Sequence, residues 1–421
     1  MSPNPPRPDL PDFALAPPLQ QQVQQEVARL AASPEVRSAF NWFRTQEPQL
    51  SHWQMEMARI PAPPFGESAR GAWLAERFRE VGLDDVRIDD VGNVFGTHPG
   101  FGRRYVTLSA HIDTVFPANT PLNIRQQGSR IYGPGVSDNG AGVTALLGIA
   151  SLLRQVRIRH ALPFVFIGNV GEEGEGDLRG MRHIFSQEHW LDSIACNVIL
   201  DGAGTDVIVA EALGSRRFEV TVRGPGGHSW SDYGIPNPIV TLARAIDSFS
   251  RANVPLSPKT SSNVGVIHGG TSVNSIPEFA SMRVDIRSTS TDEIDRLERA
   301  LRLALDQSME LERESHRPMP SPLTGEVVKI GDRPSGELPP DARILRAVRA
   351  VDQYLGNSAH VQRASTDANI PLSLGREAVA LGGGGRGGGA HTLQEWFDCS
   401  GRDLGLRRIL LTVLALAGVK E

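Results

Sequence analysis

Two adjacent glutamates stand where a buried strand is expected to end. Residues 167–180 read IGNVGEEGEGDLRG and continue the apolar run LPFVF, which is typical of a buried strand. A carboxylate beside such a strand is costly unless it is paired. Because most acidic runs are solvated turns, Glu172 and Glu173 alone fit either a polar loop or a reactive site.

Imidazole and carboxylate groups also follow other strand-like segments. In SAHIDTVF, His111 and Asp113 share a face of an extended chain, and a carboxylate beside an imidazole fixes the tautomer that a metal-binding histidine needs. Asp138 follows a Gly-Pro-Gly turn, where it would also serve as a helix N-cap. Asp201 ends VILDGAG and His391 follows a glycine-rich run. Each of these residues taken alone also fits an ordinary turn or an exposed loop.

Taken together, these groups favour a metal site. Each stands at a predicted strand-to-loop junction, and the ligands of open α/β sheets gather beyond the carboxyl ends of strands. Two imidazoles and three carboxylates are the donors that two metal ions sharing one carboxylate require. Glu172 would then remain free as the base that activates water. The candidate ligands are His111, Asp138, Glu173, Asp201 and His391.

The segments that must position these groups alternate between strands and helices. YVTLSAHIDTV, ALPFVFIGNV and ACNVILDG have the pattern of buried strands, and GAGVTALLGIASLLRQV that of an apolar helix. This alternation favours a largely parallel α/β sheet. Between residues 214 and 332 the order becomes β-α-β-β-α-β, which is ferredoxin-like. We therefore expect a proline-rich arm (1–18), a catalytic α/β domain in two parts (19–213 and 333–421) and an inserted lid (214–332).

Composition excludes several classes of protein. The chain has 421 residues, 40% of them hydrophobic and 22% charged, with a formal net charge of -5, so no nucleic-acid partner is indicated. No apolar run reaches transmembrane length and the N-terminus lacks the pattern of a secretory signal, so we expect a cytoplasmic location and no membrane partner. The two cysteines, Cys196 and Cys399, exclude a disulfide framework and a cysteine-based zinc site. The run LGGGGRGGGAH lacks GxxxxGK[ST] and fits a close-packed site loop better than a phosphate loop.

The motifs SAHIDTV, GPGVSDNGAG, GEEGEG, LDG, GPGGHSW, GGTSVNSIP, DIRS and the final AH keep an order and spacing that resemble a known family across residues 55–400. It is the dinuclear zinc hydrolase family of aminoacylase, carboxypeptidase G and peptidase T. The resemblance implies a zinc-dependent exopeptidase-type catalytic domain with an inserted lid that dimerises. It also implies that Asp138 bridges two metals, with His111 and Asp201 on one and Glu173 and His391 on the other.

The resemblance assigns further roles. Asp113 would orient His111, and Glu172 would be the general acid/base. In the lid, Asn274 and Arg287 would bind substrate. His228 would reach across a two-fold dimer interface and donate a hydrogen bond to the developing oxyanion. The resemblance also implies a cis peptide bond after Asp138. The third ligand is Asp201, as in the peptidase T branch, whereas carboxypeptidase G-like members use Glu, which favours the peptidase T-like branch.

We therefore predict a dinuclear zinc metallopeptidase that hydrolyses amide bonds as an exopeptidase acting on short peptides. The alternative is an N-acyl-amino-acid deacylase, which needs the same site and differs only in the pocket. A non-catalytic binding module is disfavoured, because the ligand set is complete and Glu172 is present. We expect two Zn²⁺ ions per subunit, although Co²⁺ or Mn²⁺ also suits such ligands. A homodimer formed through the lid is expected.

Overall fold

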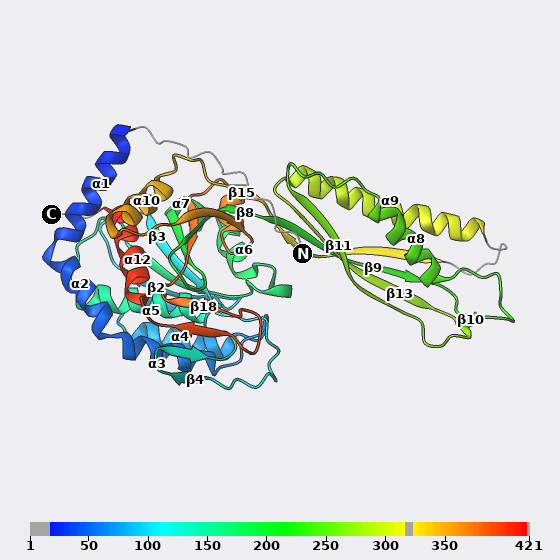
Figure 1. The fold of residues 1–421 in the computed structure, drawn as a ribbon, viewed down its shortest axis with the longest axis horizontal. Helices are drawn as coiled ribbons and strands as arrows, with labels where there is room; N and C mark the ends of the chain where they lie inside the picture. Colours follow the sequence, from blue (N-terminus) through cyan, green and yellow to red (C-terminus); the bar gives the residue numbers. More distant parts are fainter. Residues whose placement is uncertain (1–16, 316–322, 419–421) are drawn as a thin grey trace, which may run out of the picture.

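The computed structural model describes residues 17–315 and 323–418. The predicted proline-rich arm lies outside this part of the chain, apart from Pro17 and Pro18, which open the first helix, α1 (Pro17–Ala32). Two units built on separate sheets follow one another along the long axis of the molecule (Figure 1). The larger unit carries both ends of the described chain, and the smaller unit projects from it.

A mixed sheet forms the centre of the larger unit. Its strands run in the order β1-β2-β6-β3-β7-β17-β8-β15, and β16 also pairs with β8. The middle strands β6, β3, β7 and β17 are parallel, as the sequence pattern predicts, whereas β1 and β2 pair antiparallel at one edge and β8 is antiparallel to β17. A short loop can join only antiparallel neighbours, which accounts for the pairing of β1 with β2. The bounds are β1 (Asp84–Ile88), β2 (Val94–His98), β3 (Tyr105–His111), β6 (Phe164–Asn169), β7 (Ile194–Leu200), β8 (Val207–Ala212), β15 (Gly336–Glu337), β16 (His360–Ala364) and β17 (Ala378–Leu381).

Helices cover both faces of this sheet, which explains the unbroken apolar run of β6. Phe164 and Phe166 pack into the core on the side of α5, whereas Val165 and Ile167 join the core under α6 and α7. The helix α5 is buried along nearly its whole length. The remaining bounds are α2 (Pro34–Thr45), α3 (Glu47–Ala58), α4 (Ser68–Glu80), α5 (Gly140–Gln155), α6 (Arg179–Ser186), α7 (Glu188–Ser193), α10 (Arg343–Leu355), α11 (Asn369–Ser373) and α12 (Arg402–Ala417), with a small sheet of β4 (Arg125–Gln127), β5 (Arg130–Tyr132), β18 (Arg386–Gly388) and β19 (Trp396–Asp398).

The smaller unit, which we call the lid, is ferredoxin-like as predicted. Its sheet order is β11-β13-β9-β14, and a separate apolar core joins one face of the sheet to α8 and α9. A short pair, β10 (Gly227–His228) and β12 (Ser275–Ile276), lies at the end far from the larger unit (Figure 1). The predicted domain boundaries after residues 18, 213 and 332 stay a prediction, because the arrangement of helices and strands does not test which units fold independently. The bounds are β9 (Gly214–Arg223), α8 (Pro238–Ser250), β11 (Thr260–Gly269), β13 (Phe279–Ser288), α9 (Thr291–Glu314) and β14 (Thr324–Arg333).

Across residues 17–315 and 323–418, no helix has both the length and the apolar composition needed to span a bilayer.

Two histidines pack together at the end of β2. His98 lies 3.0 Å from His160 (Nδ1 to Nε2), and the His160 ring packs on Phe164. Their other ring nitrogens lie 3.2 Å from Leu153 O and 2.7 Å from Leu162 O, respectively. Burial, followed by the neighbouring His160, lowers the pKa of His98 to about 4, and burial also lowers the pKa of His160. The fold therefore favours neutral rings at this pair.

This pair predicts acid-sensitive stability. Between the ordinary histidine pKa of about 6.5 and the folded value of about 4, the unfolded chain binds protons that the folded chain does not, so stability falls as the pH falls through this window. His98→Gln should make the unfolding midpoint fall less steeply between about pH 7 and about pH 5. The exposed His52 provides the control for replacing a histidine by glutamine, and His52→Gln is measured in parallel. Equal slopes in wild type and His98→Gln would contradict this account.

Candidate metal centre

The carboxyl ends of three neighbouring parallel strands meet at one place. His111 is the last residue of β3, Glu172 and Glu173 follow β6, and Asp201 follows β7. Since β3 lies between β6 and β7 in the sheet, these side chains converge. Asp138 arrives from the turn before α5. The N-cap of that helix is the neighbouring Asn139, whose side chain accepts a hydrogen bond from Gly142 N, so the carboxylate of Asp138 is not the cap.

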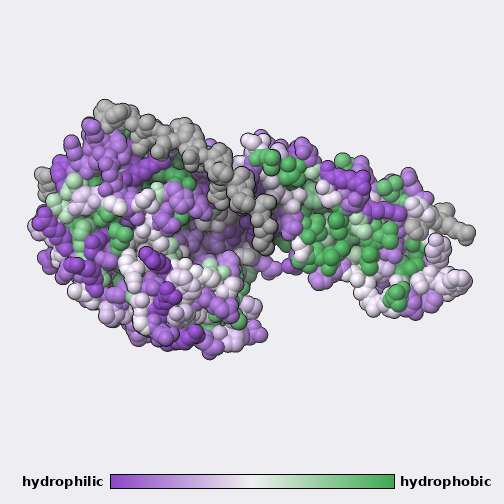
Figure 2. Space-filling model, viewed as in Figure 1, coloured by the Kyte–Doolittle hydropathy of each residue, from purple (hydrophilic) through white to green (hydrophobic). Residues whose placement is uncertain are grey.

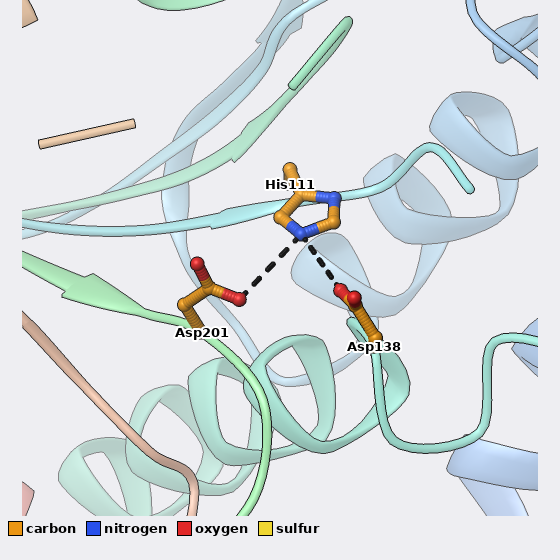
Figure 3. A group of neighbouring side chains, drawn as sticks. All are labelled: His111, Asp138 and Asp201. Atoms are coloured by element: carbon orange, nitrogen blue, oxygen red, sulfur yellow. Dashed lines mark ion pairs between the residues drawn. The ribbon is translucent and has the colours of Figure 1, made fainter. Parts of the chain in front are cut away.

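His111 and two carboxylates form the first group of possible ligands. The buried ring of His111 directs Nε2 toward Asp138 Oδ1 at 3.3 Å and toward Asp201 Oδ1 at 3.7 Å (Figure 3). On the other side of Asp138, Oδ2 lies 3.1 Å from His391 Nε2, which is also 3.1 Å from Glu173 Oε1. The two oxygens of Asp138 therefore face two different histidines.

These distances and donors fit two metal ions. The groups His111–Asp138–Asp201 and Asp138–Glu173–His391 each offer ligand atoms within 4.8 Å of one another, and Asp138 belongs to both. Ligand atoms held tetrahedrally about 2 Å from zinc stand about 3.3 Å apart, close to the 3.1–3.7 Å observed. Imidazole nitrogen and carboxylate oxygen are ligands that divalent zinc, cobalt and manganese accept. A third group, formed by His111, Glu172 and Glu173, overlaps the other two.

The charges around the histidines favour a cation. The hydrogen bond that His391 donates to Asp138 raises the pKa of His391 to about 9; burial opposes this rise, and the charge of Glu173 adds to it. Burial alone would lower the pKa of His111, yet Asp113, Asp138 and Asp201 raise it well above its usual value. Without a metal the site thus attracts protons to its imidazoles. The same negative field attracts divalent cations.

Asp113 holds two parts of the site together. Its buried carboxylate accepts hydrogen bonds from the backbone N–H groups of Glu172 at 3.0 Å and of Glu173 at 2.8 Å. Oδ1 also lies 3.6 Å from His111 Nδ1, on the side of the ring opposite the facing carboxylates. Burial alone would raise the pKa of Asp113, but His111 and these two N–H groups lower it. The carboxylate of Asp113 therefore fixes the backbone that carries both glutamates, and the backbone oxygen of the same residue lies 3.2 Å from His111 Nδ1.

The glycine-rich run before His391 packs tightly against the other site loops, as its sequence suggests. A Cβ on Gly387 would lie 2.1 Å from the hydroxyl of Ser137, and one on Gly382 would lie 2.5 Å from Ala203 O. Only residues without a side chain allow this approach to the loops that carry Asp138 and Asp201. The peptide bond between Asp138 and Asn139 is cis.

A family model described as Peptidase family M20/M25/M40 matches residues 107–414, which contain all of these groups. The chain belongs to this family.

Individual relatives of this M20 chain are distant. It is 24% identical over 243 residues to carboxypeptidase G2 from Pseudomonas sp., a match that covers 55% of this chain and 57% of that protein. The chain spans about half the length of the curated relatives it matches. Aminopeptidase PepT from Bacillus cereus shares the fold with a TM-score of 0.69 at 19% identity, over 88% of this chain and 98% of that one. A dinuclear metal binding peptidase from Bacillus subtilis gives 0.65 at 14% identity, over 90% and 100%.

The lid residues expected to act at an active site, namely His228 and the substrate-binding Asn274 and Arg287, lie at two different ends of the lid. Arg287 lines the same cavity as the M20 ligand candidates, whereas His228 and Asn274 lie in the distal β10–β12 region, where Ser229 N donates to Asn274 O at 3.0 Å. β13 runs from Arg287 back to Phe279 at the distal end, and this stretch spans roughly 26 Å at about 3.3 Å per residue. Within one chain, the structure therefore does not bring His228 or Asn274 to the metal ligand candidates.

Three buried charged residues of the site were missed by the sequence analysis. Arg333 donates to Glu172 Oε1 at 2.8 Å. Asp367 accepts from Asn169 at 2.7 Å, and burial raises its pKa to about 7. Glu395 accepts three backbone N–H groups of the turn that carries Asp138. A glutamate four residues after His391 was a visible signal for Glu395, whereas the sequence around Arg333 and Asp367 shows no comparable pattern.

Glu395 should control metal affinity without touching a metal. Its Oε1 accepts from Ser137 N at 2.7 Å and Asp138 N at 2.8 Å, and Oε2 accepts from Gly135 N at 2.8 Å. In Glu395→Gln an amide NH₂ would face one of these donors and displace the turn. We expect divalent metal to bind about 10- to 100-fold more weakly, as measured by competition with a chelator.

The matched control is Glu377→Gln. Glu377 also accepts two backbone N–H groups, those of Arg343 at 2.9 Å and Ile344 at 3.2 Å, but at the start of α10. Its substitution should leave metal affinity unchanged. Equal affinities for the Glu395→Gln and wild-type proteins would show that the turn before Asp138 does not need this carboxylate.

Proposed function

We propose that the protein is a two-metal hydrolase of amide bonds, an exopeptidase acting on short peptides. The observation that carries this proposal is Asp138, whose two oxygens face His111 at 3.3 Å and His391 at 3.1 Å. In this proposal two Zn²⁺ ions would share Asp138, with His111 and Asp201 as the other residues that would hold one ion and Glu173 and His391 those that would hold the other. Co²⁺ or Mn²⁺ would fit the same donors.

Bound metal ions would supply Lewis acidity to the scissile carbonyl and make a water molecule acidic enough to react near neutral pH. The chain itself supplies proton transfer. Glu172 accepts the proton of the attacking water and delivers it to the leaving amine as the C–N bond breaks. Burial raises the pKa of Glu172 well above its usual value, partly offset by Arg333 and His111, which suits a group that both takes and gives a proton.

Arg287 is proposed to bind a substrate carboxylate. It lines a cavity of about 220 Å³ together with Arg217 and the ligand candidates. Asp285 accepts from Arg287 Nε at 2.7 Å and from Arg217 Nε at 3.4 Å, so one carboxylate holds both guanidinium groups on the same face of the lid. A guanidinium fork suits a planar carboxylate. An N-acyl-amino-acid deacylase remains the second candidate, since its substrates carry the same carboxylate.

We propose that His228 and Asn274 serve the active site of a second copy. His228 Nδ1 accepts the backbone N–H of Trp230 at 3.2 Å and Ser231 at 3.4 Å, so the neutral ring carries its proton on Nε2. The ring is exposed, and Trp230 and Tyr233 beside it are 86% and 88% exposed, which suits burial by a partner.

An edge of the lid sheet supports the same homodimer. β11 is an edge strand that exposes Val266 and Ile267, and α8 beside it exposes Ile239 and Val240. Figure 2 shows hydrophobic surface gathered on the lid. Pairing two such edges about a two-fold axis would cover unpaired backbone groups and apolar side chains at once. A cytoplasmic location is also proposed, in keeping with the free thiols of Cys196 and Cys399.

A substrate screen with paired variants tests the proposed function. Metal-reconstituted protein should hydrolyse dipeptides or tripeptides faster than N-acyl amino acids. Glu172→Gln should keep both metals and lose at least about 10²-fold in turnover. Glu173→Gln should instead lose metal, because the side chain is a proposed ligand. Turnover of N-acyl amino acids alone would establish the deacylase, and unchanged turnover in Glu172→Gln would refute its assigned role.

Mixed dimers test the role of His228. His228→Ala and Glu172→Ala should each be nearly inactive when refolded alone, because each lacks one part of every site. Refolded together, they should recover about one quarter of wild-type activity, since random pairing leaves one complete site in half of the dimers. Mass spectrometry of the intact complexes verifies that mixed dimers have formed. Mixed dimers without activity would place His228 outside the partner's site.

A further inference from the structure

Arg333 joins the lid to the proposed proton-transfer group. It is the last residue of β14, where the chain leaves the lid, and its side chain is only 7% exposed. Nη1 donates to Glu172 Oε1 at 2.8 Å and to Ser365 Oγ at 3.2 Å, and Nη2 donates to the backbone oxygen of Glu172. The guanidinium thus holds both the carboxylate and the backbone of one residue.

Neighbouring residues fasten the same loop to the lid. Asp332 N donates to Asp177 Oδ1 at 3.0 Å, and Arg217 of β9 donates to Gly174 O at 3.1 Å. Asp177 and Leu178 have φ angles of 48° and 61°, a left-handed conformation that non-glycine residues adopt at a cost. The loop that carries Glu172 therefore depends on contacts from two lid strands.

The surroundings of Glu172 explain why a fixed cation is needed. Its carboxylate is buried beside Glu173 and near Asp367, both of which repel it. Left alone, it would turn away from these groups or remain without a fixed direction. Arg333 engages Oε1, so the second oxygen of the carboxylate stays available for proton transfer.

We propose that Arg333 is a positioning residue that fixes the carboxylate of Glu172 for proton transfer and does so from the last residue of the lid. This rests on the proposed function, in which Glu172 is the general acid/base. Arg333 lines the same cavity as Arg287, but its Nη atoms are engaged by Glu172 and Ser365, so it is assigned to neither metal nor substrate. Its loss should therefore act on turnover rather than on binding.

Arg333→Met should lower kcat by about 10- to 100-fold, because a small misplacement of a reacting group has this effect. KM should stay within about twofold and both metals should be retained. Arg333→Lys keeps the charge without the fork and should recover part of the lost kcat. In crystals of Arg333→Met, the Glu172 carboxylate should have left its position beside residue 333.

Arg216→Met is the matched control. Arg216 lies on β9 and pairs with Asp332 at 3.1 Å, with Asp295 at 2.7 Å and with Glu298 at 2.7 Å, so its loss removes ion pairs at the same junction. It should lower the unfolding temperature while leaving kcat unchanged. If kcat fell equally in Arg216→Met and Arg333→Met, the role of Arg333 would be to attach the lid to the larger unit, and the proposal would be wrong.

The other possible results of these measurements also test the positioning role of Arg333. Wild-type kcat in Arg333→Met refutes the positioning role. If Arg333→Met does not fold, Arg333→Lys decides, because a reduced kcat at unchanged KM supports the role and a wild-type kcat refutes it. Glu172→Gln is measured in parallel. Should Glu172→Gln be inactive while Arg333→Met is normal, only this inference fails, whereas full turnover in Glu172→Gln would remove the proposed function itself.

Discussion

Carboxyl groups converge beyond the carboxyl ends of β3, β6 and β7, and each repels its neighbours, most strongly where they are buried, as in Asp113, Glu172 and Glu173. Different contacts in the structure offset this repulsion. Asp113 and Glu395 accept hydrogen bonds from backbone N–H groups, whose dipoles favour the carboxylate form against the effect of burial. Glu172 is held by Arg333. Asp138, Glu173 and Asp201 lie close to the imidazole rings of His111 and His391, which are themselves drawn toward the charged form. Divalent cations supply positive charge to such a cluster of carboxylates most compactly.

The fold supplies this convergence through a few constraints. Parallel neighbours bring β3, β6 and β7 to one edge, and both faces of the sheet are covered, so the ligand loops rise from a rigid base. Asp113 then ties the end of β3 to the loop after β6, and Glu395 ties the turn before α5 to the segment that carries His391. These contacts position the segments of four proposed ligands, and the fifth, Asp201, is fixed by its backbone N–H, which donates to Leu381 O at 2.9 Å. Metal binding need not assemble the site from mobile parts.

Sequence patterns predicted the features that depend on local periodicity or on a single motif. The strand-like runs that end at His111 and Asp201, the apolar helix after Asp138 and the ferredoxin-like order of the lid all follow from such patterns. The choice of Asn139 rather than Asp138 as N-cap does not, because both side chains suit that position. Arg333 and Glu172 are 161 residues apart, and Glu395 and Ser137 are 258 apart. No local pattern marks such pairs, since only the folded chain makes each one the partner of the other.

The length of the lid separates the residues near the metal ligand candidates from the distal β10–β12 pair. Arg287 and Arg333 lie at the end beside the metal ligand candidates, while β10 and β12 lie at the other end (Figure 1). Strands of ten residues, such as β9 and β13, span roughly 33 Å and share one apolar core with α8 and α9, so the two ends move together. A lid that shifts to admit substrate must therefore carry Arg287, the contact to Glu172 and the distal His228 with it. In the proposed two-fold dimer, this rigid connection would couple the position of the lid residues at one active site to the position of those at the other.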